Sequence, residues 1–301
     1  MSAGGSTRVV VLALAANAGI AAAKFVAALV TGSGAMLAEA IHSFADAGNQ
    51  VLLLVGARRA ERPADARHPL GYGRESYFWA LLVAVLLFTL GGLFSTYEGL
   101  HKLRHPEPLE SPGWAIGVLV VSLLLEGGSL AAAWKECSRV RAGRPLLAWA
   151  GATGDVNLLV VTFEDLAALA GLGIALAAVA LTLHTGNPMW DALGTCVLGV
   201  LLLAVAGFVG AQVRRLIAGS AADPADQQAI ARVLDEHGFD VLRLVAVWSG
   251  PGRLMVALKV RPRDLAEDAA HVVARVNAAE AAVHAAVPAV RHLFVEPDVA
   301  D

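Results

Sequence analysis

Six long apolar stretches decide what this chain can fold into. They cover roughly residues 8–30, 35–57, 76–100, 113–134, 155–183 and 189–213. An α-helix needs about 20 mostly apolar residues to cross the hydrocarbon core of a bilayer. Hydrophobic residues make up 57% of the chain and charged residues only 16%, whereas a soluble domain carries about 25% charged residues. The sequence therefore predicts a polytopic α-helical membrane protein with six transmembrane helices.

Lysine and arginine are distributed unevenly among the segments that join these stretches. One set of segments is basic, with Arg58, Arg59, Arg62, Arg67, Arg74, Lys135, Arg139, Arg141, Arg144, Arg214 and Arg215. On the opposite side Lys102 and Arg104 lie beside Glu107 and Glu110. Because positively charged loops remain in the cytoplasm, we predict a multi-pass protein of the plasma or inner membrane with both termini in the cytoplasm. The first stretch is long enough to span, so we expect no signal peptide.

The composition changes after residue 217. Residues 223–238 combine a capping Asp223, a proline at the first helical position and a final glycine, which predicts a helix. Strands are predicted over 241–249 and 253–261 on either side of a Gly-Pro-Gly turn, a helix over 265–287 and a strand over 290–297. We therefore expect a transmembrane domain of residues 1–217 and a small α+β cytoplasmic domain of residues 218–301, in the order αββαβ.

Ionisable residues interrupt two of the apolar stretches. His42 and Asp46 are four residues apart in the second stretch, so a helix places them on one face. Glu164 and Asp165 lie in the fifth stretch. A charged side chain at mid-membrane costs roughly 2.5–3.5 kcal/mol on insertion scales, so such groups face the bundle interior. Imidazole and carboxylate together are ligands for a divalent metal. The alternative is that they only hydrogen-bond neighbouring helices.

Two segments resemble the cation diffusion facilitator family: MLAEAIHSFADAGNQ at 36–50 and PADARHPLGYGRES at 63–76. The resemblance runs over nearly the whole chain. It implies that the HxxxD motif on the second helix meets a second motif on the fifth helix, where together they hold one transported divalent ion. It also implies zinc/proton antiport, a homodimer and a ferredoxin-like C-terminal domain.

The fifth helix departs from the pattern of the family. Asp165 matches the last aspartate of the motif, but Val161 occupies the position four residues earlier where a histidine or aspartate is usual. Glu164 lies next to Asp165 instead, a variant that resembles the subgroup with the animal mitochondrial transporters. We predict His42, Asp46 and Asp165 as metal ligands, with Glu164 as the fourth. A hydrogen bond from Glu164 to another helix is the alternative.

Other candidate ligands are weaker. The loop residues Asp65 and His68 match a second metal site of some relatives, but Tyr72 replaces a ligand there. In the C-terminal domain only His271 and Glu296 fall where regulatory ligands lie, so we expect that domain to dimerise rather than to sense metal. Within the spans, we expect Glu126 to pair inside the bundle and Lys24 to be structural. Glu39 is a candidate guide for cations at the outer mouth.

Together these features predict a secondary transporter that exports a divalent cation, with Zn²⁺ favoured, in exchange for protons. Mn²⁺, Fe²⁺ or Co²⁺ is an alternative substrate because one nitrogen and three oxygens form a hard ligand set. A metal channel without proton coupling is another alternative, and a scaffold that does not transport is a third. No HExxH motif is visible in the sequence, so we expect no enzyme. The expected partners are metal ion, protons, the lipid bilayer and a second copy of the chain, with neither a cofactor nor nucleic acid.

Overall fold

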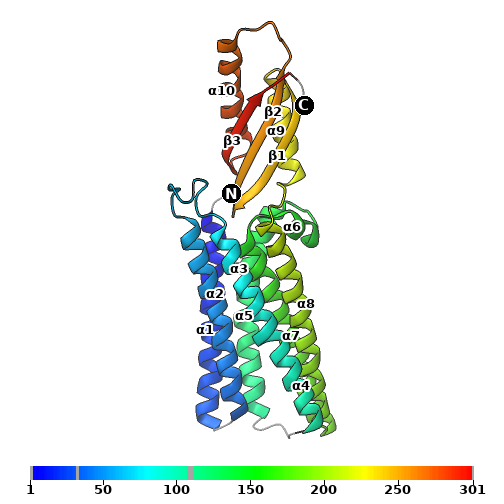
Figure 1. Ribbon diagram of the computed structural model, residues 1–301. Helices are drawn as coiled ribbons and strands as arrows, with labels where there is room; N and C mark the ends of the chain where they lie inside the picture. Colours follow the sequence, from blue (N-terminus) through cyan, green and yellow to red (C-terminus); the bar gives the residue numbers. More distant parts are fainter. Residues whose placement is uncertain (1–2, 32–33, 107–111, 300–301) are drawn as a thin grey trace.

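The protein is a long bundle of helices with a small domain at one end (Figure 1). The computed structural model describes residues 3–31, 34–106 and 112–299. Within these ranges, the side chains of residues 3, 4, 31, 34–39, 41, 42, 45 and 112 are not described. The N-terminal end of the bundle lies next to the small domain (Figure 1). The predicted fold class, a helical membrane domain followed by a small sheet domain, is confirmed.

Five helical segments of the described chain are long and apolar enough to cross a membrane. They are Gly5–Val30, Glu75–Arg104, Gly113–Arg141, Val156–Thr185 and Met189–Ile217. The elements that contain them are α1 (Ala3–Thr31), α3 (Glu75–Leu86) with η1 (Leu87–Leu93) and α4 (Phe94–Arg104), α5 (Pro112–Arg141), α7 (Val156–Thr185) and α8 (Met189–Ile217). The predicted sixth crossing corresponds to α2 (Gly34–Ala60), a helix of 27 residues that packs along α1 and α3. A short helix, α6 (Leu146–Ala152), precedes α7.

The third span, predicted as a transmembrane helix over roughly residues 76–100, is not α-helical throughout. It changes to a π-helix over η1 and returns to an α-helix in α4. After η1, α4 and α8 approach one another closely at two glycines. A Cβ on Gly99 would lie 2.6 Å from the backbone nitrogen of Cys196, and a Cβ on Gly199 would lie 2.5 Å from that of Thr96. The two helices are therefore in backbone contact, as small residues permit in membrane bundles.

The C-terminal domain has the predicted order of elements. It consists of α9 (Pro224–Glu236), β1 (Phe239–Gly250), β2 (Arg253–Pro262), α10 (Ala269–Ala286) and β3 (Val290–Pro297). β2 is the central strand, antiparallel to β1 and parallel to β3. Asp223 caps α9 through the N–H of Ala225 at 3.0 Å, as predicted. α10 begins at Ala269, four residues later than predicted, because the carboxylate of Asp268 accepts from the N–H of His271 and caps the helix there.

The hairpin between β1 and β2 rests on the end of the bundle. The buried indole of Trp248 donates to the carbonyl of Ala152 at 3.1 Å, and Arg253 donates to the carbonyl of Ala60 at 3.0 Å. A Cβ on Gly154 would lie 2.3 Å from the Trp248 ring, so the contact requires glycine at that position. The hairpin thus joins the C-terminal domain to the segment that leads into α7. The division at residues 217 and 218 stays a prediction.

Candidate metal site

The two acidic residues of α7 extend toward different neighbouring helices. Asp165 is 1% exposed and its Oδ2 accepts a hydrogen bond from the hydroxyl of Ser129 on α5, at 2.7 Å. Glu164 is 8% exposed, and its Oε1 accepts from the amide of Asn49 on α2, at 3.3 Å. Neighbouring residues of a helix point about 100° apart, which accounts for the divergence. Glu164 therefore makes the helix-to-helix hydrogen bond that was the alternative to metal binding.

The second carboxylate oxygen of Glu164 remains available. This Oε2 atom is buried and makes no hydrogen bond of ordinary geometry among the described residues, with the side-chain amide of Gln50 as a polar neighbour of the carboxylate. The carboxylates of Asp46 and Asp165 lie near enough to interact with Glu164 electrostatically. A buried oxygen without a well-formed hydrogen bond is costly, and a cation beside it would compensate that cost. The hydrogen bond to Asn49 and a contact to a metal are thus compatible.

The predicted ligands of α2 are only partly described. Asp46 is half-buried on α2, on the side of the bundle that interacts with Glu164. His42 belongs to α2, but its side chain lies outside the described residues. Over the side chains that are described, no three His, Cys, Asp or Glu residues converge closely enough to hold a metal ion. The ligand set of His42, Asp46, Glu164 and Asp165 therefore stays a prediction.

Glu126 on α5 is the acidic residue whose place the sequence did not reveal. It is buried, with electrostatic interactions with Asp165, Asp46 and Lys24. Glu126 therefore belongs to the same acidic cluster as the predicted ligands, and its expected pairing inside the bundle stays a prediction. The sequence signal for the position of Glu126 was its spacing of three residues before Ser129, which puts both residues on one face of α5. The hydrogen bond from Ser129 to Asp165 shows that this face points toward α7.

Amide side chains lie beside the acidic cluster. Asn49 and Gln50 follow Asp46 at three and four residues, so α2 presents them close to the same face. Gln50 accepts from the amide of Asn17 on α1 at 3.1 Å. The Oδ1 of Asn49 is buried without a hydrogen-bond partner in the described part of the chain, and the Nε2 of Gln50 is buried beside the Glu164 carboxylate without a hydrogen bond of ordinary geometry. These polar groups surround the carboxylates on the α1 and α2 side.

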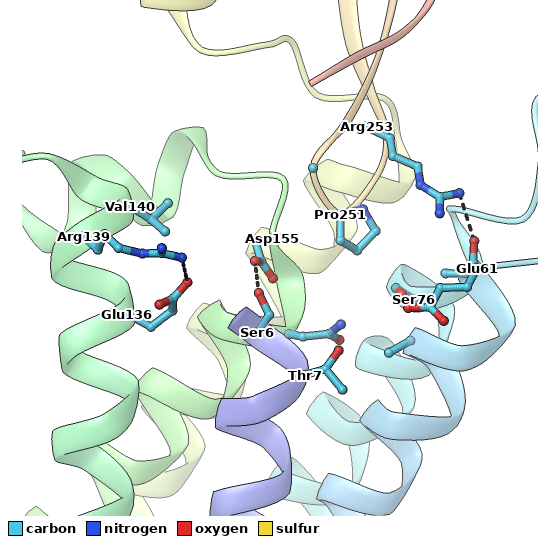
Figure 2. A pocket seen from close by; sticks show the side chains of 14 residues that line it. Ser6, Thr7, Glu61, Ser76, Glu136, Arg139, Val140, Asp155, Pro251 and Arg253 are labelled. Atoms are coloured by element: carbon cyan, nitrogen blue, oxygen red, sulfur yellow. Dashed lines mark hydrogen bonds and ion pairs between the residues drawn. The ribbon is translucent and has the colours of Figure 1, made fainter. Parts of the chain in front are cut away.

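A pocket lies at the end of the bundle that carries the C-terminal domain. Figure 2 shows its lining side chains, with Ser6 hydrogen-bonded to Asp155, Glu136 paired with Arg139, and Pro251 above them on the hairpin. The pocket encloses about 50 Å³. Asp155 also caps α7 by accepting from the N–H of Leu158 at 3.1 Å.

Asn157 connects this pocket with the acidic cluster along α7. It lines the pocket, is 4% exposed, and its Oδ1 is buried without a partner among the described residues. Asn157 and Glu164 are seven residues apart, so they lie on one face of α7 about 10 Å apart along the axis. Val160 and Val161, fully buried, lie between them. The pocket is therefore separated from the cluster by about two helical turns.

Asp65, His68 and His271 of the weaker candidates make local contacts. In the loop, Asp65 accepts from the hydroxyl of Tyr72 at 2.7 Å and from the backbone N–H of His68 at 2.8 Å. These hydrogen bonds hold the pKa of Asp65 below its ordinary value. In the C-terminal domain, the ring of His271 pairs with Asp268 at the start of α10, and Glu296 is exposed on β3. Neither pair lies in a group of three ligands within the described residues.

Comparison with known proteins agrees with this architecture. Residues 10–217 match the cation efflux transmembrane domain. The chain is 36% identical over 234 residues to "Proton-coupled zinc antiporter SLC30A9, mitochondrial" of Xenopus laevis, covering 77% of this chain and 42% of that protein. It is 35% identical over 233 residues to metal tolerance protein C4 of Arabidopsis thaliana (76% and 50%). It is 29% identical over 231 residues to "Probable cation efflux system protein Rv2025c" of Mycobacterium tuberculosis (75% and 64%).

The chain spans about half the length of the curated relatives that it matches at 34–36% identity. Those relatives therefore contain regions that have no counterpart in the matched part of this chain. The matched part of the family domain nevertheless runs from α1 to the end of α8. It includes all the acidic residues of the cluster described above. This multi-pass membrane protein belongs to the cation efflux family, the cation diffusion facilitators that its motifs resemble.

Proposed function

We propose that the chain is a secondary transporter that exports a divalent cation from the cytoplasm in exchange for protons, with Zn²⁺ as the favoured ion. The observation that carries the proposal is the group of carboxylates from α2, α5 and α7 in the bundle interior, with Oε2 of Glu164 buried and without a hydrogen bond of ordinary geometry among the described residues. The names of the relatives, a proton-coupled zinc antiporter and a metal tolerance protein, support the same function.

The proposed ligands are His42, Asp46, Glu164 and Asp165. Such carboxylates must be deprotonated, and the imidazole neutral, to bind a metal ion. Protons arriving from outside therefore compete for the same groups and release the ion. Rocking of the bundle would then expose the site alternately to the two sides. This competition couples the two fluxes without a separate proton site.

The pocket at the end of the bundle is the proposed inner mouth. It is lined by the carboxylates of Glu61, Glu136 and Asp155 and by the guanidinium groups of Arg139 and Arg253. Asn157, with its unpartnered oxygen among the described residues, lies on the α7 face that leads to Glu164. Acidic and amide oxygens suit a hydrated divalent cation. The basic loops at this end support a cytoplasmic location for it and for both termini. We further propose that the protein works as a homodimer through its C-terminal domain.

A second candidate substrate is Mn²⁺, Fe²⁺ or Co²⁺. The observation in its favour is the number of oxygen atoms at the cluster, because Glu126 adds a fourth carboxylate near Asp46 and Asp165. Carboxylate ligands suit harder ions than the nitrogen and sulfur ligands typical of zinc. A panel of these ions in reconstituted vesicles would rank the substrates directly.

The decisive experiment is metal-driven proton flux in proteoliposomes. We expect Asp46→Asn to abolish the zinc-driven proton flux. The matched surface variant Asp235→Asn should retain this flux. Asp235 forms an exposed ion pair in the C-terminal domain, and exposed pairs contribute little to stability. Wild-type flux in Asp46→Asn would remove this residue from the site.

The same vesicles separate an antiporter from a channel. Zinc uptake by an antiporter follows an imposed pH gradient and reverses when the gradient is reversed. A channel conducts zinc along its own gradient whatever the pH on the two sides. Zinc flux of equal size with and without the pH gradient would therefore overturn proton coupling while leaving the metal site in place.

A further inference from the structure

Two histidines lie together at the end of the bundle that is opposite the C-terminal domain. His101 belongs to the last turn of α4, and His105 is the residue that caps the end of that helix. This end of α4 lies at the end of the bundle away from the C-terminal domain (Figure 1). Both are exposed, and the centres of their rings are 5.1 Å apart. Their spacing of four residues places them on one face of the helix. Neither histidine belongs to the acidic cluster of the proposed transport site.

The separation of the rings fits two imidazoles that share one metal ion. A Zn–N bond is about 2.0–2.1 Å and the ligands are tetrahedral, so the centres of two rings on one ion lie about 5.2 Å apart. Helices that bind zinc through two histidines use this same spacing of four residues. The observed separation of 5.1 Å between the ring centres matches this value.

The surroundings favour a cation at this position. Tyr97, one turn earlier, stacks on His101 with ring centres 6.3 Å apart and planes 20° apart, which holds that ring in place. The C-terminal end of a helix carries partial negative charge. Lys102 forms an ion pair with Asp191 at 3.0 Å, so its charge is compensated, and solvent screens the exposed Arg104.

We propose that His101 and His105 form a surface binding site for Zn²⁺, Cu²⁺ or Ni²⁺, with water in the remaining coordination positions. Imidazole is a preferred ligand of these three ions. No third His, Cys, Asp or Glu of the described residues joins the pair, so the site is open to solvent and to exchange. Under the proposed transport direction, it lies on the face where the exported ion leaves. The two imidazoles would bind the metal ion whether or not the protein transports it.

The pair has a simpler explanation against which the proposal can be tested. Aromatic rings often pack with their centres about 4.5–7 Å apart, so His101 and His105 could pack without binding a metal. Copper distinguishes the two cases, because a Cu²⁺ ion with two imidazole ligands shows splitting from two nitrogen nuclei in its electron paramagnetic resonance spectrum. Packed rings alone give no such copper signal.

The test uses the full chain in detergent micelles. We compare wild type, His101→Ala, His105→Ala and the double variant by copper spectra and by equilibrium dialysis of zinc. His184→Ala is the matched control, since His184 is an exposed histidine at the end of α7. All the substituted side chains are exposed, and size-exclusion chromatography verifies that each variant folds.

We expect the double variant to lose the two-nitrogen copper signal and one zinc ion per chain. Each single variant should weaken zinc binding at this site at least about tenfold, because chelation by the second imidazole is lost. An unchanged copper spectrum and zinc count in the double variant would overturn the site, as would an equal loss in His184→Ala. Zinc-driven proton flux is recorded in parallel, so a failure of transport is distinguished from a failure of this site.

Discussion

Replacing Glu164 by glutamine separates its hydrogen bond to Asn49 from its proposed role as a metal ligand. The glutamine keeps an oxygen that accepts from Asn49, at a position where the wild-type distance is 3.3 Å, so the bond between α2 and α7 is retained. The substitution removes the charge and replaces the Oε2 atom by an amide nitrogen. If the hydrogen bond were the whole role of Glu164, the variant would behave almost like wild type.

The two roles differ in magnitude. A hydrogen bond to a charged group contributes about 1.5–3 kcal/mol and a neutral one about 0.5–1.5 kcal/mol, so the structural cost of the glutamine is about 1 kcal/mol. A divalent cation about 4 Å from a carboxylate gains about 8 kcal/mol at an effective dielectric constant of about 20. Even if dehydration offsets more than half of this, roughly 3 kcal/mol remains, or a hundredfold in the zinc dissociation constant.

The assay is zinc binding by isothermal titration calorimetry, beside thermal unfolding of the same samples. We expect Glu164→Gln to weaken zinc binding at least about a hundredfold and to shift unfolding little. Asn49→Ala is the matched variant, because it removes the hydrogen bond and leaves the charge. It should lower stability by about 1–3 kcal/mol and change zinc affinity less than tenfold. Zinc affinity of Glu164→Gln within threefold of wild type would refute Glu164 as a ligand.

Two further predictions concern the C-terminal domain. Gly154→Ala puts a Cβ against the Trp248 ring and should loosen the hairpin by about 1–3 kcal/mol, seen as faster proteolysis between α8 and α9. Gly151→Ala, where a Cβ meets nothing within 4 Å, should not. The pKa of Asp240 is lowered by hydrogen bonds from Arg261 and a second arginine, so its contribution to stability is present above pH 3.8 and is lost as pH falls through the lower folded value. Asp240→Asn should therefore flatten the loss of stability in acid, and an unchanged acid limb in unfolding scans would contradict this.

The candidate site was predictable up to the limits of a single helix. The helical period puts positions 42 and 46 on one face of α2, and it separates Glu164 from Asp165 by about 100° around α7. The period does not reveal which neighbouring helix each side chain meets. Glu164 turned out to meet Asn49 of α2, and Asp165 to meet Ser129 of α5. These partners depend on how three helices rotate against each other.

The sequence by itself determined where five of the spans lie and the order of elements in the C-terminal domain. Runs of apolar residues long enough for a bilayer indicated the spans, and Asp223 with the following proline indicated the start of α9, because these signals act between residues close in the chain. The short helix α6 and the π-helical segment η1 were not predicted. Only the tertiary structure decided that Glu126 joins the acidic cluster and that Trp248 rests against Gly154. Such contacts join residues far apart in sequence, and their energy comes from packing and charge between whole helices rather than from any local pattern.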